Sequence, residues 1–331
     1  MPIGKRTLLA NVLQSSGANL VLARAPLWNG LTVLNYHRIG EPGDSPYDPG
    51  LFSATPAQFA AQVRFLTQNF DVIGASDLAD WQNRRGRFVM ITFDDGYLDN
   101  YEAAYPILRA FGATGVFFLT SGFLDEGRIA WWDEISWMVR SSRLKQLSSN
   151  PWTISELTLP DADRQPVLDR LLRTYKSLPG RKTGEFLEFL ADALGTGRHP
   201  GDRSVWMDWP QVREMHAHGM QFGGHTVTHP VLSNLSRAEQ EYEVRECRER
   251  IKAELGRPIP TFSYPVGQQD SFNATTQSCL REAGYEWAFS YYGGFNRRGQ
   301  VNPFDVRRVA IESHTSWAMF RSVACLPHLF A

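Results

Sequence analysis

Two adjacent carboxylates come at the end of a predicted buried strand. Residues 92–97 read TFDDGY and close an apolar run at 88–93. Neighbouring strand residues point to opposite faces, so Asp94 and Asp95 can serve one site only if the chain turns there, and Gly96 permits such a turn. One carboxylate could then bind a metal ion while the other faces the bound water, because two uncoordinated carboxylates would repel each other. A plain surface turn is the alternative for this motif taken alone.

Two histidines with metal-ligand spacing follow a short predicted strand near Phe222. Residues 225–229 read HTVTH, and two glycines precede them. The spacing places His225 and His229 on one face of a helical turn, as two imidazole ligands of one cation require. With Asp95 they would supply two imidazoles and one carboxylate and leave coordination positions open. This pattern is typical of a catalytic rather than a structural metal site.

Alternating strand and helix signals surround both motifs. The predicted strands are 31–36, 72–73, 88–93, 115–119, one near 222, 262–264, 287–290 and 307–311. The predicted helices are 56–70, with Thr55 as its N-cap, 100–111, 209–218, 236–255, with a capping box at Ser236 and Glu239, 273–283 and 316–325. Repeated strand-then-helix units predict an α/β fold whose parallel sheet closes into an irregular (β/α) barrel. Such barrels carry their chemistry where the strands end, which is where both motifs lie.

Two segments depart from this alternation of strands and helices. Residues 125–204 carry two helical apolar stripes, at 167–178 and 186–194, and predict a helical insertion that packs as a cap. Residues 1–30 predict an N-terminal amphipathic helix, broken at Gly17, in front of a catalytic domain at 31–331. That helix is expected to pack on the domain, and the alternative is that it rests on a membrane surface.

Composition narrows the possible partners and compartments. The 331 residues carry a formal net charge of -1, which gives no field that favours nucleic acid. The three cysteines, Cys247, Cys279 and Cys325, lie far apart and indicate reduced thiols rather than a disulfide framework. Because no convincing cleavage site and no membrane-length apolar run occur, the sequence predicts a cytoplasmic protein, peripheral to the membrane in the alternative case. The oligomeric state is left open.

Four motifs, taken in order, resemble those of the NodB-homology polysaccharide deacetylases, carbohydrate esterase family four. They are LNYHRI at 34–39, TFDDG at 92–96, HTVTH at 225–229 and FSYPVG at 262–267. The resemblance implies a distorted (β/α) barrel with the helical insertion added to it. It also implies an acetylated saccharide as substrate, hydrolysis of an acetyl group, most often N-acetyl and not a peptide bond, and a divalent cation, often zinc.

The resemblance also assigns residue roles by position. Asp94 would be the general base, and the metal ligands would be Asp95, His225 and His229. Tyr264 and Pro265 would line the cleft, with the backbone N–H of Tyr264 helping to hold the oxyanion. His37 would line the site or play a structural role there.

The chain departs from the family pattern at two positions. Pro260 stands where the family often has an arginine that orients the base, and Arg257, Arg307 or Arg308 are the candidate replacements. The family's late histidine, its general acid, has His314 as its nearest counterpart, although the surrounding residues match poorly. These departures leave two alternatives open: a carbohydrate-binding homologue without catalysis, and a hydrolase of formyl or other amides at the same metal site.

Overall fold

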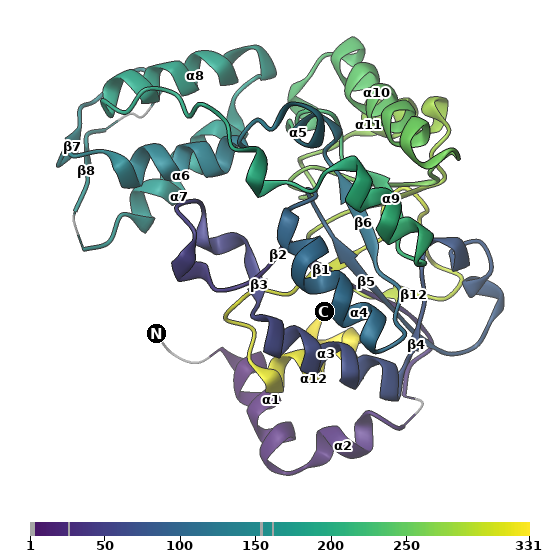
Figure 1. Cartoon of the computed structure of the whole chain (residues 1–331). Coiled ribbons are helices and arrows are strands. Elements are labelled where there is room, and N and C mark those ends of the chain that lie inside the picture. The colour runs from purple at the N-terminus through teal and green to yellow at the C-terminus, as the bar shows by residue number, and fades with distance from the viewer. Residues whose placement is uncertain (1–3, 26, 153–154, 161) are drawn as a thin grey trace.

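A curled, largely parallel sheet lies at the centre of the computed structural model, which describes residues 4–25, 27–152, 155–160 and 162–331 (Figure 1). Its strands are β1 (Gly30–Tyr36), β4 (Asp71–Val72), β5 (Arg87–Phe93), β6 (Val116–Leu119), β9 (Gln221–Gly224), β10 (Thr261–Ser263), β11 (Trp287–Phe289), β12 (Asn296–Arg297) and β13 (Arg308–Ala310). The order is β11-β10-β9-β6-β5-β1, and β13 continues it by pairing in parallel with β1. Two short strands branch from this path: β4 pairs with β5, and β12 runs antiparallel to the start of β1.

The two ends of the sheet approach each other and nearly close a ring. Phe289 of β11 pairs with Val306, which lies two residues before β13. Backbone hydrogen bonds join Val306 N to Ala288 O and Ser290 N to Val306 O, at 2.9 and 3.0 Å. The sheet therefore curls into the distorted barrel that the sequence predicts, and the predicted fold class is confirmed.

Side chains alternate between the inside of the barrel and the helices around it. On β5, Phe88 and Met90 belong to an inner cluster, whereas Val89, Ile91 and Phe93 belong to the large core beneath the helices. Both faces are buried, as expected for a parallel sheet covered by helices. The same period of two directs Thr92 and Asp94, at the carboxyl end of β5, towards the inside of the barrel.

Helices connect the strands and cover the outside of the sheet. They are α3 (Pro56–Asn69), α4 (Tyr105–Ala110), α9 (Trp209–Ala217), α10 (Arg237–Leu255), α11 (Ala274–Ala283), α12 (Trp317–Cys325) and α13 (Pro327–Phe330), with a π-helical turn η5 (Asn100–Ala104) before α4. Four of them begin with the capping box, in which the N-cap side chain and the side chain three residues later bond each other's backbone N–H: Thr55, Asp208, Ser236 and Asn273. Because η5 is π-helical, the predicted helix at 100–111 is an α-helix only in its second half.

Short elements complete the connections. A small parallel pair, β2 (Arg38–Ile39) with β3 (Phe52–Ala54), follows β1 directly. Single 3₁₀ turns occur at η1 (Pro42–Asp44), η2 (Pro49–Leu51), η3 (Ala75–Asp77), η4 (Trp81–Asn83), η6 (Arg203–Val205) and η7 (Leu232–Asn234). The loop at 40–51 between β2 and β3 places Asp48 beside the insertion, because the Asp48 N–H donates to Asp133 at 2.9 Å.

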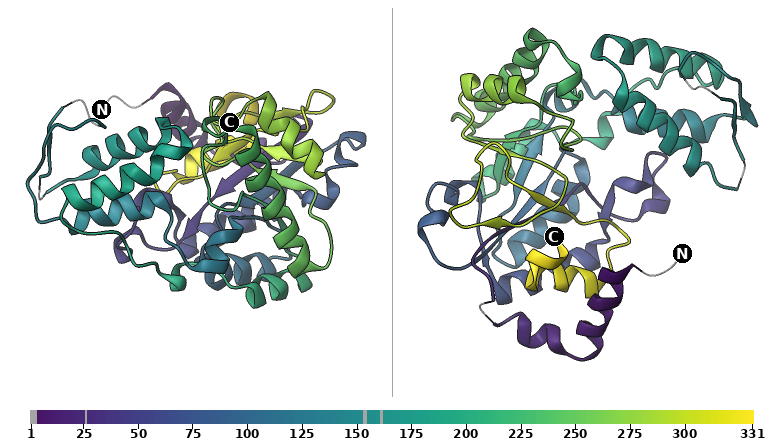
Figure 2. Two further views of the ribbon diagram at one scale, coloured as in Figure 1. Left: turned by 90° about the horizontal axis from the view of Figure 1, so that it is seen from above. Right: turned by 180° about the vertical axis from the view of Figure 1, so that it is seen from behind.

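The region predicted as a helical insertion forms a group of helices beside the barrel in each view (Figure 2). It contains α6 (Trp131–Ser141), α7 (Gln165–Ser177), α8 (Gly180–Ala193) and the antiparallel pair β7 (Gln146–Leu147) and β8 (Leu157–Thr158), whereas α5 (Ser121–Glu126) comes before it and packs against α10. Tyr175 of α7 stacks on Trp131 of α6, with ring centroids 4.1 Å apart. The buried carboxylate of Glu134 pairs with Arg198 and thereby ties α6 to the segment after α8.

The N-terminal segment forms two helices that pack against α12. These are α1 (Lys5–Ser15) and α2 (Ala18–Leu22), separated by Gly17 with a left-handed φ of 72°. The Trp28 indole N–H donates to Cys325 O at 2.9 Å, and Arg321 of α12 donates to Gln14 at 3.0 Å. The predicted break at Gly17 is therefore present. Among the described residues, no helix combines the length and apolarity needed to cross a bilayer.

Candidate functional site

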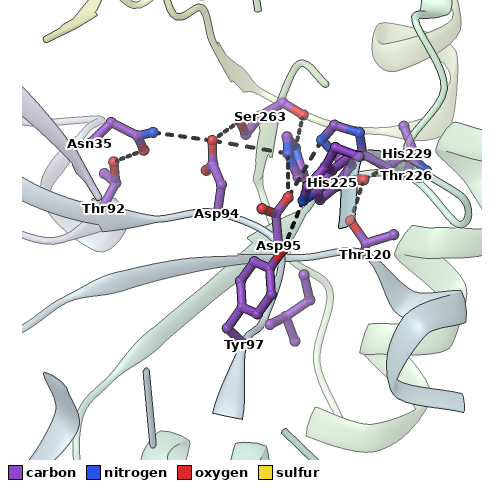
Figure 3. A network of polar contacts seen from close by, with 12 residues as sticks. Asn35, Thr92, Asp94, Asp95, Tyr97, Thr120, His225, Thr226, His229 and Ser263 are labelled. Carbon is purple, nitrogen blue, oxygen red and sulfur yellow. Dashed lines mark hydrogen bonds and ion pairs between the residues drawn. The ribbon is translucent and has the colours of Figure 1, made fainter. Parts of the chain in front are cut away.

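Asp94 ends β5 inside the barrel and forms a buried ion pair with an arginine from the other end of the chain. Arg308 of β13 donates from both terminal nitrogens to the two carboxylate oxygens, at 2.7 and 2.8 Å. Arg308 has no exposed surface, and Asp94 is 3% exposed. Asn35 and Ser263 donate to the same carboxylate at 3.3 Å each (Figure 3). Of the three arginines considered as replacements at this position, Arg308 is the one that the fold brings to Asp94.

Asp95 leaves the strand in a turn and points towards the histidines. Its φ is 78°, a left-handed value that is uncommon for a residue with a Cβ, and Gly96 follows with a φ of 94°. The turn is made by both residues and not by the glycine alone. It lets two adjacent carboxylates serve one site, since Asp94 stays inside the barrel while Asp95 turns to His225 and His229, as Figure 3 shows.

The two imidazoles converge on Asp95. Nε2 of His225 and Nε2 of His229 each lie 3.4 Å from Asp95 Oδ1. The Nδ1 atom of His225 lies 2.7 Å from the carbonyl oxygen of Ser263, which fixes the proton on Nδ1 and leaves Nε2 as the free lone pair. Ligand atoms of the three residues lie within 4.8 Å of one another, and all three residues are buried.

The histidine pair lies in a loop and not on a helical turn, so the predicted local geometry is wrong. No helix is assigned at 225–231, and Thr226 and His229 adopt left-handed φ values of 69° and 57°. The loop is held from outside by Glu243 of α10, whose carboxylate accepts from the backbone N–H groups of Val227 and Thr228 at 2.7 and 2.9 Å. The imidazoles converge because of these contacts and not because of helical periodicity.

The residues present fit a divalent cation. Asp95 Oδ1 is buried and makes no hydrogen bond of good geometry within the part of the chain that is described, although two imidazoles face it. A buried carboxylate oxygen without a donor is costly, and a cation between it and the two Nε2 atoms would satisfy all three. Two imidazoles and one carboxylate are a donor set that zinc and similar divalent ions accept.

Asp94 and His229 differ in charge. Burial alone would raise the pKa of Asp94, but the guanidinium of Arg308 outweighs it and holds that pKa well below its usual range. Burial lowers the pKa of His229 to about 3. Asp94 is thus an ionised carboxylate and His229 a neutral imidazole, which are the forms needed by a base and by a metal ligand.

A cavity of about 210 Å³ opens onto these groups. Asp94, Asp95 and both histidines form its floor, and His37 lines it as well. The His37 backbone is fixed on both sides: its N–H donates to Ser53 at 3.0 Å and its carbonyl accepts from Asn100 at 2.7 Å. Its ring meets Tyr291 edge to face, with centroids 5.6 Å apart, so the imidazole is positioned while its residue stays partly exposed.

The structure places three of the predicted residues differently from the expectation. The His314 side chain is 80% exposed and does not line this cavity, although it pairs with Glu312, which does; the chain turns outwards after Glu312. The backbone N–H of Tyr264 already donates to Phe289 O at 3.0 Å in the sheet, so it is not a free oxyanion donor. Tyr264 itself lines the cavity, whereas Pro265 is buried outside it.

Two tryptophans of the insertion form part of the cavity wall and support His229. The indole N–H of Trp131 donates to the His229 carbonyl at 3.1 Å. The ring of Trp132 meets the His229 ring edge to face at 4.4 Å, and its N–H donates to the hydroxyl of Tyr97 at 2.8 Å. The start of α6 therefore contacts the predicted ligand directly, beyond the cap role that the sequence indicates.

Residues that sequence reasoning left unassigned hold the site together. Asn35 lies in the first motif and Ser263 in the fourth, and both contact Asp94. Their positions at strand ends were a usable signal, since inward-facing residues there point to the site. Glu243 gave no such signal, because a glutamate in a long charged helix resembles any solvated helix residue.

Comparison with known sequences indicates one family. A sequence profile described as "Polysaccharide deacetylase" matches residues 82–177 and 185–288, which is more than half of the chain. A Bacillus subtilis protein named "Putative polysaccharide deacetylase YxkH" is 20% identical over 295 residues, covering 88% of this chain and 74% of that protein.

Two solved structures are similar in fold. The Streptococcus pyogenes deacetylase PplD, solved in complex with acetate, aligns with a TM-score of 0.57 at 16% identity, over 88% of this chain and 96% of that one. A de-N-acetylase from Aggregatibacter actinomycetemcomitans aligns with a TM-score of 0.56 at 18% identity, over 87% and 97%. At these identities the likeness concerns the fold.

Proposed function

Because the chain belongs to the polysaccharide deacetylase family, we propose that it is a metal-dependent hydrolase that releases acetate from an N-acetylated saccharide. One observation carries the proposal. An ionised carboxylate, Asp94, lies beside a cluster of Asp95, His225 and His229 that fits a cation, with Asp94 Oδ2 4.0 Å from His225 Nε2. A base next to open metal ligands is an arrangement that binding alone does not need.

The ligand set defines what a cation would supply. Bound by Asp95, His225 and His229, a divalent ion such as zinc would polarise the acetyl carbonyl and acidify a water molecule. Asp94 is the residue proposed to take the proton of that water as it attacks. Its two bonds to Arg308 keep the carboxylate ionised and fix its direction, so the proton-accepting oxygen is held in place before substrate arrives.

His37 is the proposed proton donor to the leaving group. It is partly exposed, it lines the same cavity as Asp94 and Asp95, and its backbone is fixed on both sides. His314, the counterpart suggested by family position, lies outside this cavity. An amine leaves poorly unless it is protonated, so a donor in the cavity supports cleavage of an amide over that of an ester.

Contacts in the structure bear on the two alternatives to deacetylation that the sequence leaves open. A carbohydrate-binding homologue without catalysis was suggested by the missing motif arginine, but Arg308 supplies a guanidinium to Asp94. A formyl or other small amide would react with the same residues, so this alternative changes the substrate and not the site. Aromatic side chains in the cavity wall, Trp131, Trp132 and Tyr291, favour a sugar ring as the neighbour of the reacting amide.

Acetate release from N-acetylated oligosaccharides tests the function directly. We expect the wild type to release acetate, to lose this activity on treatment with a strong chelator, and to regain it with added zinc or another divalent ion. Asp94→Asn should reduce turnover by about 10²–10⁴-fold while leaving metal content unchanged, because the base is lost and the ligands remain. Metal content is measured on the purified protein.

Other results would redirect or remove the proposal. Release of formate in place of acetate from matched N-formyl and N-acetyl substrates would assign the formyl alternative. Full activity of Asp94→Asn, or activity that survives complete metal removal, would rule out the proposed site. For the proton donor, His37→Gln should slow N-acetyl cleavage far more than cleavage of an activated acetate ester, since a good leaving group needs no acid.

A further inference from the structure

The N-terminal helices present apolar side chains to the outside. Leu8, Leu9 and Val12 of α1 are 59%, 44% and 52% exposed, and Val21 and Leu27 in the following segment are 70% and 50% exposed. Positions 8, 9 and 12 fall within about 100° of one another around a helix, so they form one face. We call these three residues the N-terminal apolar face; Val21 and Leu27 are further exposed apolar side chains of the same segment.

This face is held in a fixed orientation by the opposite side of α1. Ala10 is fully buried and Leu13 packs against the core beside it. Gln14 accepts from Arg321 of α12, and Trp28 anchors the end of the segment to the Cys325 carbonyl. The exposed leucines therefore do not belong to a core that is incompletely packed, because α1 already buries a separate stripe.

The charged side chains of residues 1–40 have one sign. Residues 1–40 contain no aspartate or glutamate, whereas the whole chain contains 35. Lys5, Arg6 and Arg24 lie in the same two helices and their continuation, and all three are exposed. The chain as a whole has a net charge of -1, so the positive charge is a local property of this end.

We propose that the N-terminal apolar face docks on an anionic phospholipid bilayer, lying in the interface and not crossing it. Exposed leucine and valine side chains would enter the boundary of the acyl chains, while the basic side chains remain level with the phosphate groups. A second protein copy would gain from the apolar residues but would bring the same positive charge against itself. Charge complementarity thus favours the lipid surface.

The location of the face suits this role. In Figure 1, α1 and α2 lie at the bottom of the molecule beside α12, away from the insertion helices α6 to α8 at the upper left. Neither α1 nor α2 contributes a residue to the lining of the cavity that holds Asp94 and Asp95. Docking would therefore leave the cavity free, and the inference does not depend on the proposed deacetylase activity.

Vesicle sedimentation with the full chain tests the proposal. Wild type should bind vesicles of phosphatidylcholine mixed with phosphatidylglycerol, and bind pure phosphatidylcholine vesicles far less. Leu8→Gln/Leu9→Gln/Val12→Gln should lower the partition coefficient on the mixed vesicles at least about tenfold, because glutamine keeps the helix and removes the apolar contact. Lys5→Glu/Arg6→Glu should also weaken it, by at least about fivefold for each basic side chain lost.

A matched variant controls for general surface hydrophobicity. Leu144→Gln/Tyr242→Gln replaces side chains that are 44% and 57% exposed elsewhere on the surface, and it should bind vesicles like the wild type. Absence of wild-type binding to the mixed vesicles, or equal binding by the triple glutamine variant, overturns the proposal. So does light scattering that finds a wild-type dimer and a monomeric triple variant, because a second copy would then cover the face.

Discussion

At the scale of single residues, the pair of Asp94 and Arg308 defines the site. Removing two charges from water is costly, and such a pair is tolerated only when the geometry is good and the remaining hydrogen bonds are made. Here both carboxylate oxygens accept hydrogen bonds from the guanidinium. Further hydrogen bonds join the pair to Asn35, Ser263 and Ser290. The result is a base whose protonation state and direction are set in advance.

Replacing Arg308 by lysine should separate the effect of its positive charge from its effect on the orientation of the Asp94 carboxylate. Arg308→Lys keeps a cation but cannot form the two parallel bonds, so we expect kcat to fall by about 10²-fold with bound metal retained. Arg307→Lys is the matched control, since Arg307 lies next to it and stacks over Tyr292 without touching Asp94. Steady-state kinetics and metal analysis of both variants check this prediction, which fails if Arg308→Lys turns over at the wild-type rate.

At the scale of elements, the loop that carries the two histidines depends on a helix. Its backbone adopts left-handed values at Thr226 and His229, which are unfavourable for residues with a Cβ and persist only when neighbours enforce them. Glu243 of α10 supplies that constraint by accepting two backbone N–H groups and the Thr228 hydroxyl. The ligand geometry thus depends on a helix residue that lies 15 and 16 positions downstream of the two backbone N–H groups it holds.

Removing this constraint should weaken metal binding without touching a ligand. In Glu243→Ala the buried N–H groups of Val227 and Thr228 lose their acceptor, so the loop relaxes and metal affinity should fall about 10–100-fold. Glu246→Ala, an exposed glutamate on the same helix, should bind metal like the wild type. Competition with a chelating dye measures the affinities. Equal values for the two variants would show that the loop holds its shape unaided.

At the scale of the whole molecule, the insertion and the barrel meet at a buried carboxylic acid. Asp133 of α6 accepts from the Tyr97 hydroxyl at 2.7 Å and from the Asp48 N–H at 2.9 Å, and it has no exposed surface. Burial raises its pKa to about 7, although these two hydrogen bonds and Arg38 act in the opposite direction. The insertion is therefore connected to the motif that carries Asp94 and Asp95.

This acid should make the stability depend on pH. Asp133 has a pKa near 4 when unfolded, so between about pH 4 and pH 7 the unfolded chain has released a proton that the folded chain retains. Folded stability contributed by this residue therefore decreases as pH rises through that window and is constant above it. The asparagine in the variant Asp133→Asn cannot titrate. The free energy of unfolding of this variant, relative to that of the wild type, should therefore rise by a few kcal/mol, at most about 4, between about pH 4 and about pH 7.

Urea denaturation of both proteins across that window measures the difference. Asp192→Asn, an exposed aspartate on α8 in the same insertion, should follow the wild type at every pH. A stability difference between Asp133→Asn and wild type that does not change with pH would contradict the assignment of a raised pKa to this group.

Local signals in the sequence determined most of the elements and the ligand set. Apolar runs placed β1 and β5, N-cap residues placed the starts of α3 and α10, and the motifs at strand ends identified Asp94, Asp95, His225 and His229. These features depend on neighbouring residues, so periodicity and capping rules suffice to recognise them. Parallel strands then bring their carboxyl ends to one rim whatever the details of packing.

Contacts between distant segments decided the rest. Arg308 reaches Asp94 across 214 residues because β13 pairs with β1, and no local pattern distinguishes it from Arg307 or Arg257. The outward turn that carries His314 away from the cavity likewise follows from tertiary packing, and so does the use of the Tyr264 N–H within the sheet. A side chain's partner depends on strand register and loop path, which only the folded chain fixes.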